Sequence, residues 1–326
     1  MAAMMWTALA ANSVVPPVAA VQADPATRVM AGATNYLAVE VPRWRREHPC
    51  YSCHNNGDGA RALIAASRKG LVQTGQFADA VRWLLTPDRW SSNSADGGVK
   101  DLPLSRIQFA AALQRLVAAG AASQEALDIA ATLVAADQRA DGSWPISATS
   151  NIGTPSGYGT PLATAIATSV LRSATTAAAR AATQRADGWF RGFTPEAVLE
   201  ASAVLLGLGE SADEPAVVAR RRALEILKNG QGPDGGWGPY PSSQSEVFDT
   251  AIGMLALRAF RRDPSLARPV FTEQQWRSAL DRGRQFLIER QETDGSWAET
   301  TRPALQESYS QRVSTTAWAL LALIEE

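Results

Sequence analysis

Cysteine and histidine are nearly absent from this chain of 326 residues, which contains two of each. Two cysteines are too few for a disulfide-stabilised scaffold. Three of these four residues fall within positions 50–54, so they are concentrated rather than scattered. Long apolar runs are missing as well, and none approaches the ~20 residues that a membrane-spanning helix needs. We therefore expect no transmembrane segment.

Charge is also scarce, and the two signs balance. Charged residues make up 19% of the chain, and the formal net charge is -1 at pH 7. The chain has no global basic field that could hold a phosphate backbone, which excludes nucleic acid as an expected partner. Apolar residues make up 46%, enough to bury a sizeable core.

The first 23 residues are small or apolar and carry no charge. Val21 and Ala23 suit the -3 and -1 positions of a signal-peptidase site, and Asp24 follows them. We therefore predict a secretory leader over 1–23 and a mature protein over 24–326 that is periplasmic or otherwise exported. Two prolines interrupt the apolar stretch and a basic start is missing, so an alanine-rich N-terminus without structure, or a misplaced start codon, is the alternative.

A segment of the form Gln-x-x-Asp-Gly-(Ser/Gly)-Trp occurs three times, at 138–144, 231–237 and 291–297. A weaker copy at 184–189 lacks one residue before the tryptophan. Each copy follows an amphipathic stretch, and Asp-Gly after a helical run is a stop signal because glycine supplies a positive φ. We predict that the tryptophans of the full copies, Trp144, Trp237 and Trp297, are buried at equivalent turns between helices.

Amphipathic and apolar helices are predicted to alternate along the chain. An amphipathic helix belongs at a surface, and a helix that is apolar nearly all round belongs in an interior. The expected outer helices cover 27–39, 76–86, 123–137, 174–185, 214–229 and 273–290. The expected inner helices cover 57–68, 105–119, 160–171, 194–208, 249–260 and 314–324; the last four open on Thr, Asp or Ser, which we expect to act as N-caps. Six such hairpins predict an all-α (α/α)6 toroid that closes on itself, with the inner helices lining the axis.

The three repeated segments resemble the QW repeats of the prenyltransferase and squalene/oxidosqualene cyclase superfamily. The resemblance implies a toroid of this kind over roughly residues 70–326. Squalene-hopene-type cyclases protonate an alkene with an acid from an Asp-x-Asp-Asp motif that opens an inner helix. Here only Asp249, with Thr250-Ala251 after it, matches the end of that motif, and we expect Asp249 to be an N-cap. The zinc site of the protein prenyltransferase subunits cannot form, because no Cys or His follows His54.

The segment 49–57 contains Cys50-x-x-Cys53-His54, the c-type haem attachment motif. Two thiols at this spacing can add to the two vinyl groups of one haem, and the adjacent histidine then lies under the iron. We predict covalently bound haem c on Cys50 and Cys53 with His54 as the proximal iron ligand. Met30, in the first outer helix, and Met254, on an inner helix, are weak candidates for the distal ligand, and if neither binds, the iron is five-coordinate or binds water.

Three other interpretations of the cysteine pair remain open. A redox dithiol would favour a thioredoxin-like βαβ context rather than a helical one. A zinc site would need further ligands, and only His48 or a carboxylate is at hand. The two thiols could also be small buried apolar groups.

The favoured function is an exported c-type haem protein on a cyclase-like toroid. It would transfer electrons to a redox partner protein, or use an open iron on a small apolar ligand in the lumen. The alternatives are an isoprenoid cyclase-like enzyme, or a non-catalytic binding module without haem.

Overall fold

The structure is a computed structural model that describes residues 24–93, 101–146, 152–209, 211–259, 270–300, 302 and 308–325. The predicted leader over 1–23 lies outside these residues. The described part is helical and contains no strand beyond two isolated β-bridges, which join Trp237 to Gln231 and to Glu246. The predicted all-α class is confirmed. None of the helices described is both long and apolar enough to cross a membrane.

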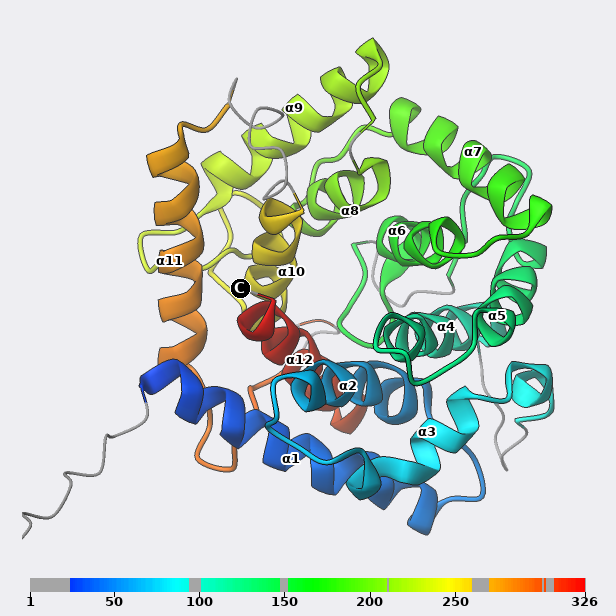
Figure 1. Ribbon diagram of the computed structural model, residues 1–326. Helices are drawn as coiled ribbons and strands as arrows, with labels where there is room; N and C mark the ends of the chain where they lie inside the picture. The colour runs from blue at the N-terminus through cyan, green and yellow to red at the C-terminus, as the bar shows by residue number, and fades with distance from the viewer. Residues whose placement is uncertain are drawn as a thin grey trace, which may run out of the picture.

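Six helical hairpins form two concentric layers around one axis (Figure 1). The outer helices are α1 (Pro25–Glu47), α3 (Ala78–Leu84), α5 (Gln124–Ala136), α7 (Ala177–Gly192), α9 (Glu214–Gly230) and α11 (Glu273–Glu289). The inner helices are α2 (Ala60–Arg68), α4 (Leu102–Ala118), α6 (Gly159–Arg172), α8 (Val198–Leu208), α10 (Val247–Arg258) and α12 (Tyr309–Ile324). A π-helical segment, Cys53–Gly59, leads into α2, and short 3-10 turns, Thr74–Phe77 and Pro87–Ser92, flank α3.

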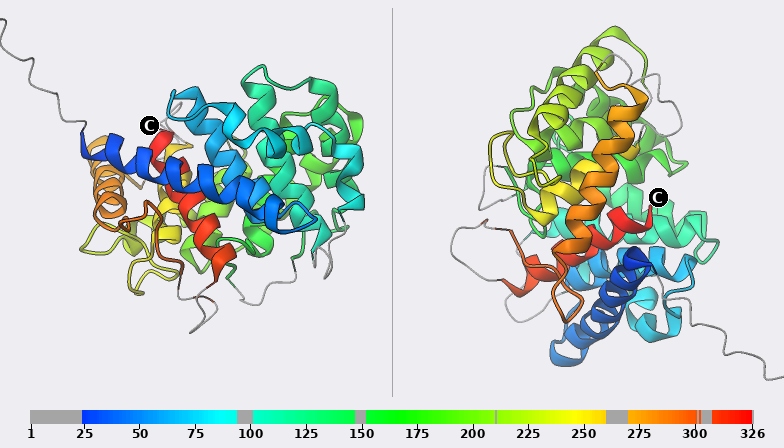
Figure 2. Two further views of the ribbon diagram at one scale, coloured as in Figure 1. Left: turned by 90° about the horizontal axis from the view of Figure 1, so that it is seen from below. Right: turned by 90° about the vertical axis from the view of Figure 1, so that its left-hand side faces the viewer.

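The ring is closed. Each inner helix contacts the next, and α12 contacts α2. The first and last helices, α1 and α12, also contact each other and lie side by side in both views of Figure 2. The predicted toroid of six hairpins is therefore the observed fold.

The three full repeats form the same turn, and each tryptophan connects an outer helix to an inner one. Trp144, Trp237 and Trp297 are fully buried, as predicted. Each indole N–H donates a hydrogen bond of 2.7–2.8 Å to the carbonyl ten residues earlier, near the end of the preceding outer helix. Each backbone N–H of these tryptophans donates to a threonine hydroxyl of the following inner helix, on Thr164, Thr250 and Thr316 respectively.

The glutamine of each repeat connects neighbouring outer helices. The amides of Gln138 and Gln231 donate 2.8 Å hydrogen bonds to carbonyls of the next outer helix, those of Ala182 and Ala279. The third, Gln291, donates a 2.8 Å hydrogen bond to the carbonyl of Val29 on α1. The last repeat therefore holds the first helix in the way that the other repeats hold their successors, and this contact seals the ring.

The weak copy at 184–189 does not form such a turn. It lies inside α7, which continues to Gly192, so the predicted outer helix 174–185 ends too early. In a full copy such as 138–144, Gly142 has φ 97°, and a Cβ there would lie 2.3 Å from the carbonyl oxygen of Arg185 on the next outer helix. At Gly188 a Cβ would meet no atom within 4 Å. Because the weak copy lacks one residue before its tryptophan, Gly188 does not lie close to a neighbouring helix, and glycine is not required there.

The N-caps also differ from the prediction. Side-chain caps are found mostly on outer helices; for example, Ser123 and Asp213 accept hydrogen bonds from N–H groups in the first turns of α5 and α9. The inner helices α6, α8, α10 and α12 open without a hydrogen bond from a side-chain cap. Asp249 is not an N-cap, because it lies inside the first turn of α10. At α10, the backbone carbonyl of Trp237 accepts a 2.9 Å hydrogen bond from the N–H of Glu246, the residue that precedes the helix.

Candidate functional site

A buried carboxylate lies between the inner helices, near the axis of the ring. Asp58, at the end of the π-helical segment, is 2% exposed. Its Oδ2 accepts hydrogen bonds from Gln108 Nε2 of α4 at 2.9 Å and from Ser314 Oγ of α12 at 2.8 Å. Its Oδ1 accepts a hydrogen bond from the phenol of Tyr158, which immediately precedes α6. Three separate parts of the ring therefore meet at one carboxyl group.

Two glycines allow this approach. A Cβ on Gly57 would lie 2.9 Å from Cβ of Gln108, and a Cβ on Gly59 would lie 2.7 Å from Val41 Cγ2. Because side chains at these positions would push the segment away from α4 and α1, glycine on both sides of Asp58 lets the backbone bring the carboxyl to the axis.

Burial raises the pKa of Asp58 to about 7, although the hydrogen bonds from Tyr158 and Ser314 and the charge of Arg61 favour the ionised form. Burial, and the nearby Asp58 carboxylate, also raise the pKa of the Tyr158 phenol well above its usual range. At neutral pH both protonation states of Asp58 are populated, so this carboxyl can give or accept a proton without a large free-energy cost.

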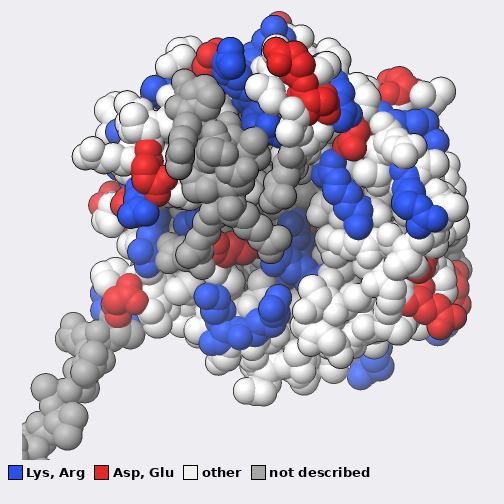
Figure 3. Space-filling view, turned by 45° about the horizontal axis from the view of Figure 1, so that its top comes forward, with Lys and Arg blue, Asp and Glu red and all other residues white. Residues whose placement is uncertain are grey.

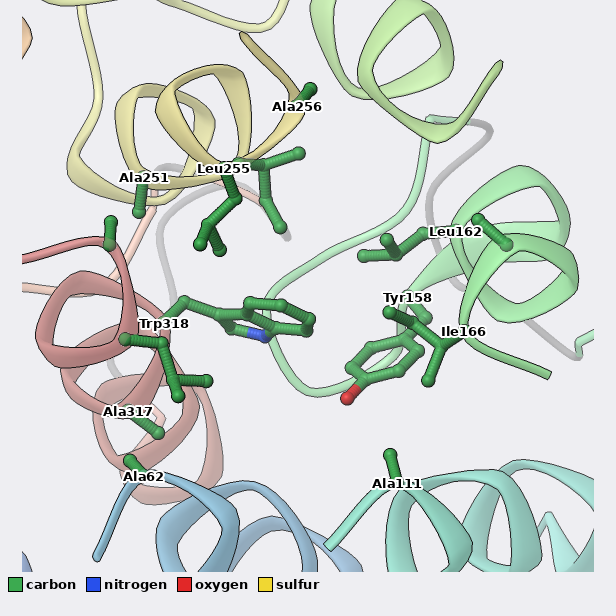
Figure 4. Close-up of a cluster of buried hydrophobic side chains, with 14 of the residues drawn as sticks. Ala62, Ala111, Tyr158, Leu162, Ile166, Ala251, Leu255, Ala256, Ala317 and Trp318 are labelled. Carbon is green, nitrogen blue, oxygen red and sulfur yellow. The ribbon is translucent and has the colours of Figure 1, made fainter. Parts of the chain in front are cut away.

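Aromatic rings surround the axis beside this carboxyl. The ring centroids of Trp318 and Tyr158 are 5.5 Å apart, and those of Trp318 and Phe248 are 6.2 Å apart. Figure 4 shows Trp318 and Tyr158 reaching from opposite sides of the ring toward each other, with Leu255 and other apolar side chains around them. The guanidinium of Arg61 lies 4.7 Å from the Trp318 ring centroid.

The backbone of Tyr158 is strained. Among the non-glycine residues that the structure describes, it alone has a positive φ, at 58°. Such a conformation costs of order 1–3 kcal/mol and is often found at functional sites. In this backbone conformation the phenol of Tyr158 points toward Asp58 and donates its hydrogen bond to Oδ1.

A second buried acid lies on α10. Asp249 is 0% exposed, and its Oδ2 accepts a 2.9 Å hydrogen bond from Nη2 of Arg302. The same guanidinium lies 3.6 Å from a carboxylate oxygen of Glu246. Burial raises the pKa of Asp249 to about 6, and the charge of Arg302 limits this rise. In the four residues 246–249, where the Asp-x-Asp-Asp motif would fall, the third position is Phe248, whose ring contacts Trp318.

The predicted cysteine–histidine cluster lies on the π-helical segment and just before it. Cys50 is buried, Cys53 is half-buried, and both thiols are free. The ring of His54 packs edge-on against Trp44 at 5.3 Å and Tyr309 at 6.2 Å. Burial raises the pKa of Cys53 to about 12 and lowers the pKa of His54 to about 3. The thiol of Cys53 is therefore protonated, and the imidazole of His54 is neutral.

The chemistry of this donor set fits haem attachment. The thiols are unpaired, and the Nε2 atom of His54 is buried without a hydrogen-bond partner. The structure does not bring Met254 to this place: it packs on α10 against α11, where a Cβ on Gly283 would lie 3.0 Å from its Sδ. Nor do the described residues contain a group of three or more His, Cys, Asp or Glu side chains suited to a metal ion, so the zinc alternative gains no ligands.

The sequence does not predict Asp58, Gln108, Tyr158 and Ser314 as site residues. A signal was present for three of them, since Asp58, Gln108 and Ser314 are polar residues within predicted inner helices. The sequence predicts a helix start at Gly57-Asp58-Gly59, whereas in the structure the two glycines allow a close approach of the backbone to α4 and α1.

Comparison with known proteins places this chain near the isoprenoid cyclases. Residues 169–302 match the family model of the squalene-hopene cyclase C-terminal domain. The chain is 34% identical over 108 residues to lanosterol synthase ERG7 of Saccharomyces cerevisiae, and 36% identical over 121 residues to a drimenyl diphosphate synthase of Streptomyces showdoensis. It is 32% identical over 115 residues to a terpene cyclase/mutase, ntnI, of a Nectria species. These matches span 32–35% of this chain and only 13–20% of the relatives.

Solved structures share the fold over nearly the whole chain. The type II terpene cyclase MstE from Scytonema, in its apo form, superposes with a TM-score of 0.55 at 13% identity and covers 92% of this chain and 98% of its own. A variant of the same cyclase in complex with its substrate, geranylgeranyl dihydroxybenzoate, gives 0.53 at 13% identity, with the same coverage of both chains. A protein from Actinoplanes gives 0.54 at 17% identity and covers 93% of this chain and 99% of its own.

These findings overturn the predicted function of an exported haem protein for electron transfer or haem chemistry. The matched family and the named relatives are isoprenoid cyclases and synthases, and the alternative interpretation, a cyclase-like protein, fits better. The short Cys-x-x-Cys-His motif misled the prediction because it covers five residues, whereas the fold signal covers the chain. The protein shares the α/α toroid fold of the type II terpene cyclase MstE, and its residues 169–302 resemble the C-terminal domain of squalene-hopene cyclase.

Proposed function

We propose that this protein is a terpene-cyclase-like enzyme that holds an isoprenoid in the interior of its ring, with Asp58 as the proton donor. One observation carries the proposal: a buried carboxyl with a raised pKa lies on the axis and receives three hydrogen bonds, beside the aromatic rings of Trp318 and Tyr158. The similarity to cyclases supports the class of substrate.

The arrangement suits the protonation of an alkene. The proton of the Asp58 carboxyl moves to one alkene carbon, the π electron pair forms the new C–H bond, and the neighbouring carbon becomes cationic. The carboxylate left behind is stabilised by the donors that already point at it, Gln108, Ser314 and Tyr158. A second double bond of the substrate then attacks the cation and closes a ring. Loss of a proton to water or to the carboxylate ends the reaction.

Aromatic faces stabilise the intermediate cation. A cation within about 6 Å of an indole or phenol ring is attracted by its π electrons. The Trp318 face already accepts the Arg61 guanidinium in this way, at 4.7 Å. Tyr158 and Phe248 add two further rings around the same point.

Asp58 is preferred to Asp249 as the donor for two reasons. The charge of Arg302, which forms an ion pair with Asp249, favours the ionised form of that carboxyl, and the pKa of Asp249 is about 6 whereas that of Asp58 is about 7. In addition, the third position of the family's acidic motif is Phe248, so the carboxyl that the family places there is replaced by a phenyl ring.

The test is turnover of isoprenoids by the wild type and by Asp58→Asn. We expect cyclised products of squalene or of geranylgeranyl diphosphate, detected by gas chromatography and mass spectrometry. Asp58→Asn should lose at least about 10²-fold in rate while still binding substrate, as followed by quenching of tryptophan fluorescence. Asp128→Asn, on the exposed side of α5, is the control. Unchanged turnover in Asp58→Asn would refute the role of this acid. Binding without product in the wild type would favour the second candidate, a binding module.

A separate proposal concerns a cofactor and not the function. We propose that Cys50 and Cys53 can carry haem c with His54 on the iron, supported by the free thiols and by the unpartnered Nε2 of His54. A bound haem would supply an iron centre on the π-helical segment. Intact mass of protein matured in a periplasm that contains the haem-attachment machinery should show one haem adduct, lost on Cys50→Ser with Cys53→Ser. A mass without the adduct would end this proposal.

A further inference from the structure

One loop of the chain is buried in the interior of the ring. Residues 152–158 directly precede α6, and within this segment Ile152, Thr154 and Tyr158 are at most 9% exposed. Connecting segments almost always run over the surface of a protein, because a buried loop must satisfy its backbone polar groups. In Figure 4 the ribbon that leads to Tyr158 passes across the middle of the ring beside Trp318. We call residues 152–158 the strap.

Side chains of α12 hold the strap from the other side of the ring. The amide of Gln311 donates a 3.0 Å hydrogen bond to Thr154 Oγ1, and its Oε1 accepts a 3.0 Å hydrogen bond from the N–H of Ser156. The indole N–H of Trp318 donates to the carbonyl of Pro155 at 3.2 Å. Gln311 makes two of these three bonds, so it is the side chain that chiefly fastens the strap to α12.

Two glycines that lie close together form the neck of this loop. Gly153 has φ 82° and Gly159 has φ 74°, a conformation that favours glycine. A Cβ on Gly153 would collide with the carbonyl oxygen of Tyr158, and a Cβ on Gly159 would lie 2.9 Å from the Cα of Gly153. Residues 154–158 therefore form a compact loop on a narrow neck. Loop-end positions of this kind can absorb the backbone rotation of a moving segment.

The strap closes one end of the ring and carries part of the site. It lies where the inner helices begin, whereas the opposite face, where α2, α4 and α6 end, has a hollow of about 340 Å³ in its middle (Figure 3). The Tyr158 phenol, at the end of the strap, donates to Asp58, and the amide of Gln108 donates both to Asp58 and to the carbonyl of Ser156. Movement of the strap would therefore take Tyr158 away from the acid and free the indole N–H of Trp318.

We propose that the strap opens about Gly153 and Gly159 to admit an apolar chain to the interior and, on closing, returns the Tyr158 phenol to Asp58. Opening breaks the two hydrogen bonds of Gln311 and requires no helix of the ring to move. Only the nature of the admitted chain rests on the proposed function. The opening itself rests on the contacts of the strap.

Hydrogen–deuterium exchange, measured by mass spectrometry, tests the opening. We expect the peptide that covers the strap to exchange at least about tenfold faster than the peptide that covers α6, because local opening is easier than global unfolding. Gln311→Ala should speed exchange in the strap by about tenfold or more and leave α6 unchanged, since it removes two hydrogen bonds to the strap. Gln114→Ala is the matched control and should leave the strap unchanged, because Gln114 donates to Ser169 and Ser173 at the other end of the ring.

Farnesol is the probe for entry of an apolar chain. Stopped-flow quenching of tryptophan fluorescence should show that farnesol binds about tenfold faster to Gln311→Ala than to the wild type, because the open strap is more populated in the variant. Equal rates, or no binding of farnesol, would overturn the role of the strap in admitting a chain. Equal exchange in the strap and in α6, before and after the substitution, would overturn the opening itself.

If Gln311→Ala fails to fold, judged by circular dichroism, Thr154→Val decides instead, since it removes the hydroxyl that accepts the Gln311 amide. The proposed function can fail separately. Faster farnesol binding by the variant, in a protein that gives no cyclised product, supports the strap and refutes the enzyme. Cyclised products from a protein whose strap opens only with global unfolding refute the strap and support the enzyme.

Discussion

Ser314, on the last helix, donates a 2.8 Å hydrogen bond to Asp58, which precedes it by 256 residues. The bond crosses the seam at which the end of the chain meets its beginning, because α12 packs on the π-helical segment and on α1. The carboxyl on the axis thus obtains one of its three donors only when the ring is closed. A change that opens the ring should therefore also remove the hydrogen bond from Ser314 to Asp58.

The seam can be tested with a matched pair of variants, Gln291→Ala and Gln231→Ala. Each removes a 2.8 Å hydrogen bond to the next outer helix, the first across the seam and the second inside the array. We expect both to lower the free energy of unfolding by a similar amount, about 1 kcal/mol. Chemical denaturation measures it. A negligible effect of Gln291→Ala beside a clear effect of Gln231→Ala would mean that the ring is open in solution.

Asp58 should make stability depend on pH. The folded pKa of about 7 lies above the ordinary value of 3.8. Between these values the folded state keeps a proton that the unfolded state loses, so the stabilising contribution is fully present below about pH 4 and declines as the pH rises through about 7. The Asp58→Asn variant has no ionisable group at this position and therefore lacks this pH-dependent contribution to stability. The free energy of unfolding of wild type minus that of Asp58→Asn should fall over this range and level off above it; a flat difference would contradict the raised pKa.

Thr250→Val should destabilise the protein although it keeps the side chain's shape. The substitution removes the hydroxyl that accepts the backbone N–H of Trp237 at 2.9 Å, and that N–H is buried. An unsatisfied buried donor costs about 1–3 kcal/mol. Thr132→Val, whose hydroxyl bonds only within the exposed face of α5, is the control and should change unfolding by well under this amount. Equal effects of the two substitutions would count against the role of the threonine in the turn.

Arg302→Gln should lower the free energy of unfolding, because it removes the ion-pair partner of the buried Asp249 carboxylate. Removing one partner of a buried ion pair leaves an uncompensated charge, which costs about 3–5 kcal/mol. The pKa of Asp249 is raised to about 6, so its carboxyl becomes neutral in mild acid and the loss should be smaller at about pH 5 than at about pH 8. Adding Asp249→Asn should recover much of the stability at the higher pH. Thermal unfolding at the two pH values is the measurement, and a loss independent of pH would argue against this pairing.

The leader remains a prediction from the sequence. Cleavage after Ala23 would make Asp24 the first residue, and Asp24 is the N-cap of α1, where its Oδ1 accepts the N–H of Ala26 at 2.9 Å. We expect N-terminal sequencing of exported material to begin near Asp24. Exported protein that retains Met1 would refute the cleavage site.

The fold could be predicted because its signals are local and repeated. Helical periodicity, the Asp-Gly stops and Trp144, Trp237 and Trp297 each identify a turn without reference to the rest of the chain. The weak copy at 184–189 shows the limit of this reasoning, since one missing residue turned a stop into continuous helix.

The site could not be predicted in the same way, because it depends on contacts between distant residues. Asp58 meets Tyr158 and Ser314 only through the closed ring, and a single sequence holds no record of that pairing. Asp249 shows a related difficulty: its ion-pair partner, Arg302, lies 53 residues away in a loop region and carries no motif. The cysteine–histidine motif was easier to see than either acid because its residues are adjacent in sequence.

Gln291 connects the last hairpin to Val29 of the first hairpin in the same way that neighbouring hairpins are connected elsewhere. The arrangement of the hairpins around the axis therefore does not depend on which hairpin comes first in the chain. A gene rearranged so that the old ends are joined by a linker, and the chain is cut in another loop between hairpins, would encode the same twelve helices in the same neighbourhoods. The junction between α12 and α1 is then one of six junctions between hairpins. New domains, tags or sensors could be attached at any side of the ring, while Asp58 keeps its partners.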